Sequence, residues 1–429
     1  MNRIILIGNG FDLAHGLKTS YKDFIDDYWD GFMNYCMSQD AWNTYGNYKY
    51  DCIELIMPKT GLTLSHFLPD GDNPLNRPNK KSISYSELKE EFVEFNKRYE
   101  CPESKIKLSI GNKFLLHLIR KCNIEMGWVD IENEYYKFLC KFLTRHVNKS
   151  YEYPNINYLN NDISYIKGKL QEYLLRTVAI TEISESNQIQ KIIYSNFSVD
   201  EFSNESKIEV NNKKTNKIKK FPQTSNTEYI SPKISQANDH HDSMTQYVDL
   251  KPDNMMFLSF NYTNSEMLYV DKNKAVENKF VLLDIHIHGE LNNTNNPLIF
   301  GYGDELEENY SKLENMQDNA YLENIKSVKY LETNNYKQLL NFINSDKYQV
   351  IILGHSCGNS DRTLLNTLFE HENCVSIKPY YYRYKDKETG EIKDNYSDIV
   401  RNISRSFKDK KSMRDKVVNK TYTTWFSED

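Results

Sequence analysis

Short unbroken apolar runs recur along the chain and predict strands that are buried on both faces. The first is Ile4–Ile7, and the most strand-like is Tyr348–Leu353. A run of this length without polar alternation is typical of a central strand in a parallel sheet. Similar runs lie at Met255–Phe260, Phe280–His286, Leu298–Phe300 and Cys374–Tyr382. Because helical segments separate these runs, we expect an α/β fold.

Apolar residues at helical spacing dominate the long segment after the first strand. Leu88, Phe92, Phe95 and Tyr99, for example, form one stripe within Ser84–Tyr99. We therefore expect residues 31–195 to form an all-helical insertion, with a Pro- and Gly-rich loop at Gly61–Lys81. Other helices are expected at Phe11–Leu17, Tyr21–Tyr28, Lys113–Arg120, Val129–His146, Ile163–Leu175 and Asp394–Phe407.

Composition sets the remaining boundaries. Residues 196–253 are rich in Asn, Ser, Thr and Lys, and the basic run Asn211–Lys220 is short enough to be a solvated loop. We expect a discontinuous Rossmann-type domain over residues 1–30 and 254–385, the helical insertion over 31–195, a polar flexible insertion over 196–253, and a C-terminal helix and tail over 386–429.

Charge and cysteine content exclude several classes of protein. The net charge of −6 gives no general attraction to nucleic acid or acidic lipid, and no run approaches the ~18 apolar residues of a membrane helix. The seven cysteines are odd in number and form no CxxC pair, which argues against a disulfide framework and a zinc ribbon. We expect a cytoplasmic protein with no metal and no membrane contact.

The turn after the first strand has the composition of a phosphate-binding loop. Gly8, Asn9 and Gly10 follow Ile7 directly, and Phe11 can open a helix whose positive end favours an anion. A full dinucleotide fingerprint would have a third small residue where Leu13 stands. By itself the motif is therefore weak.

Polar clusters also follow the other core strands. They are Asn261-Tyr262-Thr263, His288-Gly289 and Gly354-His355-Ser356. In an open parallel sheet the ligand binds beyond the carboxyl ends of the strands, so these clusters should meet at one rim. Any one cluster could be an ordinary polar turn, but the repetition favours a nucleotide site.

Six sequence blocks resemble the AbiH family of bacterial abortive-infection, anti-phage proteins. They are GNGFDLAHGL, WVDIE (Trp128–Glu132), FNYTN (Phe260–Asn264), IHGEL (Ile287–Leu291), FGYGDE (Phe300–Glu305) and GHSCGNSDRTLLN (Gly354–Asn366). The resemblance extends over nearly the whole chain. It implies a role in antiviral defence more than it implies a reaction.

The order of the motifs is similar, more distantly, to that of sirtuin-like NAD-binding domains. This likeness implies that Gly8 and Gly10 approach the pyrophosphate of NAD, that Asn261 and His288 lie at the nicotinamide ribose, and that Gly354 and Ser356 hold the adenosine. Asn9, Phe11, Thr263, Gly289 and His355 complete the expected cofactor-binding set.

The chain departs from the sirtuin pattern in three places. It has no zinc module, it has Phe11-Asp12 in place of a small residue and Ser, and it has Phe260 where a Gln would precede the Asn. Lysine deacylation is therefore not expected, whereas hydrolysis of NAD stays open.

Cleavage of the ribose–nicotinamide bond passes through a sugar cation, much like glycoside cleavage. His288 could act as the general base, Asn261 could position water or ribose, and Asp12 could be a ribose or water ligand. Each has a structural alternative: a turn histidine for His288, a tight turn for Asn261 and a helix cap for Asp12.

Other polar residues are assigned structural roles. Asp361 is expected to cap a helix, and His286 to be structural. Glu132 marks a helix entry and could contribute to the site. Cys357 shows no feature that predicts a nucleophile.

The leading hypothesis is an anti-phage effector that binds NAD and hydrolyses it to nicotinamide and ADP-ribose. The alternative is a nucleotide-binding sensor or interaction protein of phage defence without this activity. A third hypothesis, a metal-dependent nuclease, would use Asp304, Glu305 and Asp361. The sequence leaves open whether a phage-encoded protein triggers the activity and whether the chain forms a homo-oligomer.

Overall fold

The computed structural model describes most of the chain. The described residues are 1–38, 46–58, 84–98, 101, 104–124, 131–143, 153–204, 206–207, 251–270, 281–303, 305–386 and 389–428. The predicted loop at Gly61–Lys81, residues 128–130, Asp304 and most of the predicted polar insertion lie outside these ranges.

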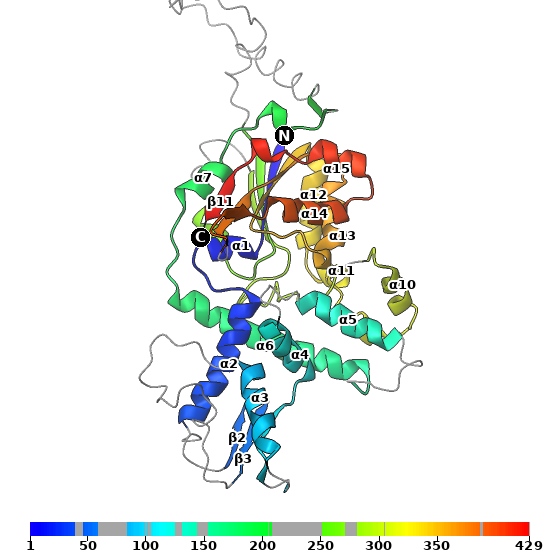
Figure 1. Ribbon diagram of the computed structural model, residues 1–429. Helices are drawn as coiled ribbons and strands as arrows, with labels where there is room; N and C mark the ends of the chain where they lie inside the picture. Colours follow the sequence, from blue (N-terminus) through cyan, green and yellow to red (C-terminus); the bar gives the residue numbers. More distant parts are fainter. Residues whose placement is uncertain are drawn as a thin grey trace, which may run out of the picture.

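A five-stranded, all-parallel sheet lies at the centre of one half of the molecule, with helices packed against it (Figure 1). The spatial order of the strands is β6-β5-β1-β7-β8, which in chain order is third, second, first, fourth and fifth. This is the doubly wound order of Rossmann-type folds, and it confirms the predicted α/β class. The strands are β1 (Asn2–Ile7), β5 (Asn254–Ser259), β6 (Val281–His286), β7 (Tyr348–Leu353) and β8 (Cys374–Pro379).

The apolar runs supply both faces of this sheet. In β1, Ile4 and Leu6 belong to one core, and Ile5 and Ile7 belong to the core on the opposite face. Successive side chains of a strand point to opposite faces, so a strand covered on both sides must be apolar throughout. The first core includes α12 (Asn335–Ser345), α13 (Arg362–Phe369) and α14 (Tyr396–Ser406), and the second includes α1 (Asn9–Ala14) and α7 (Asn187–Ile193).

The predicted all-helical insertion is wrong in one respect, because it also contains a three-stranded antiparallel sheet. β2 (Gly46–Tyr50), β3 (Ile53–Met57) and β4 (Lys107–Ile110) lie in the order β2-β3-β4. In β3, buried Ile53, Leu55 and Met57 alternate with half-buried residues. The sequence does not show this alternation, because Ile56 is also apolar, and the strand is only five residues long.

The helices of the insertion pack with this sheet into one large core. In Figure 1, α6 crosses the middle of the molecule, between the parallel sheet on one side and α2, α3, β2 and β3 on the other. The helices are α2 (Tyr21–Ser38), α3 (Tyr85–Asn96), α4 (Lys113–Ile124), α5 (Ile131–Leu143) and α6 (Ile156–Ile180).

The remaining elements correct two further predictions. Leu298–Phe300 is buried but is not a strand, and the predicted strand at Cys374–Tyr382 divides at Tyr380. The C-terminal tail is structured, because its last strand pairs in parallel with β9. These elements are α10 (Glu308–Glu314), α11 (Lys326–Lys329), β9 (Tyr381–Lys385), β10 (Ile392–Asp394), α15 (Lys410–Lys416) and β11 (Trp425–Glu428).

None of the helices in the described residues combines the length and the apolar character needed to cross a membrane.

Candidate functional site

A cleft of about 310 Å³ lies beyond the carboxyl ends of the parallel strands. The segments that follow β1, β5, β6 and β7 all line it, so the predicted convergence of the polar clusters on one rim is confirmed. The strand order reverses between β1 and β7, and this switch point is where doubly wound folds bind ligands. The insertion also contributes to the cleft wall through Glu132, Leu170 and Leu174.

Most of the residues predicted for the site line this cleft. They are Gly8, Asn9, Gly10, Asp12, Asn261, Thr263, His288, Gly354, His355 and Ser356. Phe11 does not: its side chain is fully buried and packs against His15 and Tyr269. Gly289 is also absent from the lining and has a backbone φ of +88°.

Close packing against the loop after β7 explains why Gly8 and Gly10 are glycines. A Cβ on Gly10 would lie 2.9 Å from the Cα of Gly354, and one on Gly8 would lie 2.6 Å from the Cα of His355. The N–H of Gly8 donates to Leu353 O, and that of Gly10 donates to Gly354 O. The two loops thus lie backbone against backbone, and these two N–H groups are engaged within the protein.

Asp12 is buried in the cleft wall and bridges two segments. Its carboxylate accepts hydrogen bonds from Thr263 Oγ1 at 2.6 Å and from Ser265 Oγ at 2.5 Å. Gly8 is the N-cap residue of α1, so Asp12 is not the cap that the sequence left as an alternative. Burial raises the pKa of Asp12 to about 6, against the opposing effect of the two hydroxyl donors.

Asn261 joins β5 to the turn after β1. Its Nδ2 donates to Gly8 O at 3.1 Å, and its backbone carbonyl lies 3.1 Å from Nδ1 of His286. His286 is itself buried and paired with Glu266, in keeping with the structural role expected of it. Asn261 is therefore fixed in place at the cleft, with its side chain only 6% exposed.

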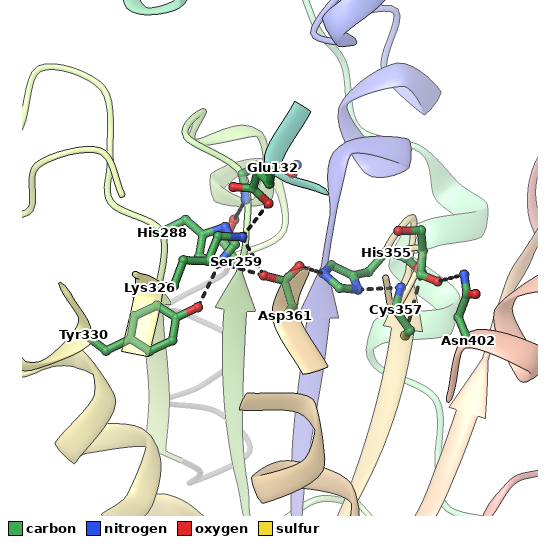
Figure 2. A network of polar contacts seen from close by, with 11 residues as sticks. Glu132, Ser259, His288, Lys326, Tyr330, His355, Cys357, Asp361 and Asn402 are labelled. Carbon is green, nitrogen blue, oxygen red and sulfur yellow. Dashed lines mark hydrogen bonds and ion pairs between the residues drawn. The ribbon is translucent and has the colours of Figure 1, made fainter. Parts of the chain in front are cut away.

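A buried ionic network lies at the floor of the cleft (Figure 2). Lys326 is fully buried, and its Nζ donates to Glu132 Oε2 at 2.6 Å and to Asp361 Oδ1 at 2.7 Å. Burial acts to lower the pKa of Lys326, but the two carboxylates outweigh it and raise that pKa. Burial likewise acts to raise the pKa of Asp361, but Lys326 and His288 hold it well below its usual range. Lys326 and Asp361 are therefore both charged at neutral pH.

His288 and His355 both contact the carboxylate of Asp361. His288 Nε2 is 3.2 Å from Oδ1 and 3.1 Å from the hydroxyl of Tyr330, and burial followed by the charge of Lys326 lowers the pKa of His288 to about 4. His355 Nδ1 accepts the N–H of Cys357, so Nε2 carries the proton that faces Asp361 Oδ2 at 3.5 Å.

The predicted capping role of Asp361 is wrong. Asp361 occupies the N-cap position of α13, but its side chain makes no capping hydrogen bond. The carboxylate turns instead toward Lys326, because a buried ammonium ion attracts a carboxylate more strongly than a backbone N–H does.

Sequence reasoning missed Lys326 and Tyr330. Both lie in a charged, helix-forming segment that reads as solvent-exposed, and no spacing rule connects them with strand ends far away in the chain. Their partners Glu132 and Asp361, by contrast, both lie in blocks that resemble a known family.

The charge of the site favours a cationic group in the cleft. The two carboxylates of Glu132 and Asp361 share one ammonium group, that of Lys326, so the formal charge of this cluster is −1, and the lowered pKa of His288 keeps its imidazole neutral at pH 7. Asp12 adds a further negative charge above its pKa of about 6. Fixed charges in a water-poor site act strongly on charge that develops during a reaction.

A doubly wound parallel sheet with a cleft at its switch point defines a Rossmann-type α/β protein. Comparison with protein families goes further. The family "Bacteriophage abortive infection AbiH" matches residues 4–384, so the chain belongs to the AbiH family. This membership implies a function in phage abortive infection. No curated protein and no solved structure matches the chain.

Proposed function

We propose that this abortive-infection protein acts by binding NAD in the cleft and hydrolysing it to nicotinamide and ADP-ribose. The observation that carries the proposal is the position of Asn261, His288 and an anionic cluster at the switch point of a Rossmann-type sheet. The sirtuin-like order of the motifs supports the choice of NAD.

The charge distribution supports the proposed chemistry. When the bond from C1′ of the ribose to the nicotinamide nitrogen breaks, the electron pair leaves with nicotinamide and the sugar becomes a cation. The net negative cluster of Glu132, Lys326 and Asp361 would stabilise that cation. Water then adds to C1′ and releases a proton, which the neutral imidazole of His288 can accept.

An unsatisfied donor in the cleft wall supports ligand binding. Asn9 Oδ1 accepts the hydroxyl of Thr19, but Asn9 Nδ2 is buried and finds no hydrogen-bond partner within the described part of the chain. Buried polar groups without a partner are rare, and an acceptor on a bound ligand would satisfy this one.

The decisive experiment measures nicotinamide and ADP-ribose released from NAD by the purified full chain, with and without a lysate of phage-infected cells. We expect release under at least one of these conditions. Asn261→Ala and His288→Ala should each abolish it while thermal unfolding stays cooperative. Asn295→Ala, on an exposed loop, and His371→Ala, which precedes β8 at the opposite end of the sheet, are the matched controls.

The alternative is a nucleotide sensor without hydrolysis. It is favoured by the hydrophobic Leu170 and Leu174 of α6, through which a bound ligand would contact the insertion as well as the sheet. Saturable binding of NAD without release of nicotinamide, in triggered and untriggered samples, would reject the hydrolase and leave the sensor.

A further inference from the structure

A second group of ionisable side chains lies next to Asn261, whose backbone carbonyl contacts one of them, His286. Asp284 and His286 are two residues apart on β6, the edge strand, and therefore point to the same face. Glu266 comes from the short 3-10 helix Ser265–Leu268 that follows β5. One potential ligand atom from each of the three residues lies within 4.8 Å of the other two.

Glu266 is left incompletely satisfied within the protein. Its side chain is fully buried, and Oε1 lies 3.0 Å from His286 Nε2, but Oε2 has no hydrogen-bond partner among the described residues. A buried carboxylate oxygen without a partner is costly, because it has lost its water and gained nothing in return. The orphan oxygen belongs to the same carboxylate that faces His286.

His286 is oriented as a metal-binding histidine would be. Its Nδ1 lies 3.1 Å from the carbonyl oxygen of Asn261, so that nitrogen carries the proton and donates. Nε2 points toward Glu266, and it becomes a ligand once the proton that it shares with that carboxylate is released to solvent. Metal-binding histidines commonly donate their second N–H to a backbone carbonyl in this way. Asp284 is exposed and offers a path of entry.

We propose that Glu266, Asp284 and His286 form a binding site for a divalent first-row transition-metal ion such as Zn²⁺. One imidazole and two carboxylates suit such an ion, and a water molecule can complete a tetrahedral set. On binding, the ion replaces the proton that His286 otherwise shares with Glu266. The two carboxylates then balance the charge of the ion.

The proposed ion would act on the cleft through the backbone. It would fix His286, which holds the carbonyl of Asn261, and Asn261 in turn holds Gly8 through its side chain. The ion would thus stiffen the cleft wall without touching a ligand inside it. One consequence concerns chelators, because a loss of activity in EDTA would not by itself identify a metal nuclease. The proposal does not depend on NAD hydrolysis.

The test uses the full chain, freed of metal with a chelator and then titrated with Co²⁺ and Zn²⁺. Co²⁺ binding is followed by its visible absorption, and Zn²⁺ by competition. We expect the wild type to bind a single ion per chain. Asp284→Asn should weaken binding by at least about tenfold, because even outer-shell partners of a metal are worth that much. His286→Gln should abolish it.

Glu290→Gln is the matched control. Glu290 follows the same strand, but its carboxylate is used by Asn264 and Asn293. Asp284 is exposed, so Asp284→Asn remains decisive even if a substitution at buried His286 prevents folding. Saturable binding that only Asp284→Asn and His286→Gln impair supports the site. Absence of saturable binding at millimolar metal, or equal binding by all variants, overturns it.

Discussion

Asp12 shows how the position of a single residue changes its chemistry. In the sequence it stands where a first-turn acid or cap would be expected, and in the structure it is a buried bridge to Thr263 and Ser265. Burial, the largest influence on it, raises its pKa to about 6, whereas an unfolded chain gives Asp a pKa of about 3.9. The folded state therefore keeps the proton of Asp12 over a range of pH in which the unfolded state releases it.

This difference predicts that the stability of Asp12→Asn relative to the wild type rises with pH. Stability contributed by a group with a raised carboxyl pKa is present at low pH and is lost as pH rises from about 4 to about 6. Asn does not titrate, so its advantage over Asp should grow by about 1–2 kcal/mol between pH 5 and pH 8. Urea denaturation at both pH values, in EDTA, measures it. An advantage independent of pH would contradict the shifted pKa.

At the scale of elements, the junction between the turn after β1 and the turn after β7 decides where the cleft lies. Gly354 has a φ of +71°, and a Cβ there would lie 2.1 Å from the backbone nitrogen of Phe11. Gly16 has a similar φ of +79°, but nothing lies within 4 Å of its Cβ position. The two glycines share a backbone conformation and differ in the space around them.

This pair separates backbone strain from steric overlap. Gly16→Ala should cost only about 1–2 kcal/mol, which is the price of a left-handed conformation for an L-residue. Gly354→Ala should cost well beyond that and also weaken ligand binding, because the two turns must move apart. Chemical denaturation and calorimetric titration with NAD measure the two effects. Equal destabilisation by the two substitutions would show that the turns are not in close contact.

At the scale of the whole molecule, one buried lysine joins the insertion to the parallel sheet. Lys326 precedes β7 in the chain, Glu132 belongs to the insertion, and Asp361 follows β7. Removing the positive charge leaves the buried carboxylates of Glu132 and Asp361 without the ammonium group that they share. The cost of breaking such an arrangement exceeds the net contribution of the ion pairs themselves.

Lys326→Met should therefore destabilise the protein by about 3–5 kcal/mol. Lys312→Met, which removes the exposed ion pair with Glu308, should change stability by less than about 1 kcal/mol. Denaturant unfolding of both variants measures the difference. Adding Glu132→Gln to Lys326→Met should recover part of the loss, since one uncompensated charge is removed. If the double variant were no more stable than Lys326→Met, the network would not hold the two parts together.

The sequence determined the parallel sheet and the rim at which the cleft lies. The unbroken apolar runs of β1, β5 and β7 predict parallel strands that are buried on both faces. Residues that follow parallel strands lie at the same edge of the sheet. Helices α3, α5 and α14 were recognisable for a similar reason, since each carries an apolar stripe within continuous chain.

Only the tertiary structure decided which charges meet. Glu132, Lys326 and Asp361 come from segments separated by large parts of the chain, and the Glu266–Asp284–His286 group depends on how β5 and β6 align. Local sequence patterns do not indicate such distant pairs. A buried charge is stabilised by its partner in space, and that partner need not be near it in sequence. The same limit applies to Asp361, whose local position indicated a cap and whose partner proved to be a lysine that sequence patterns treat as exposed.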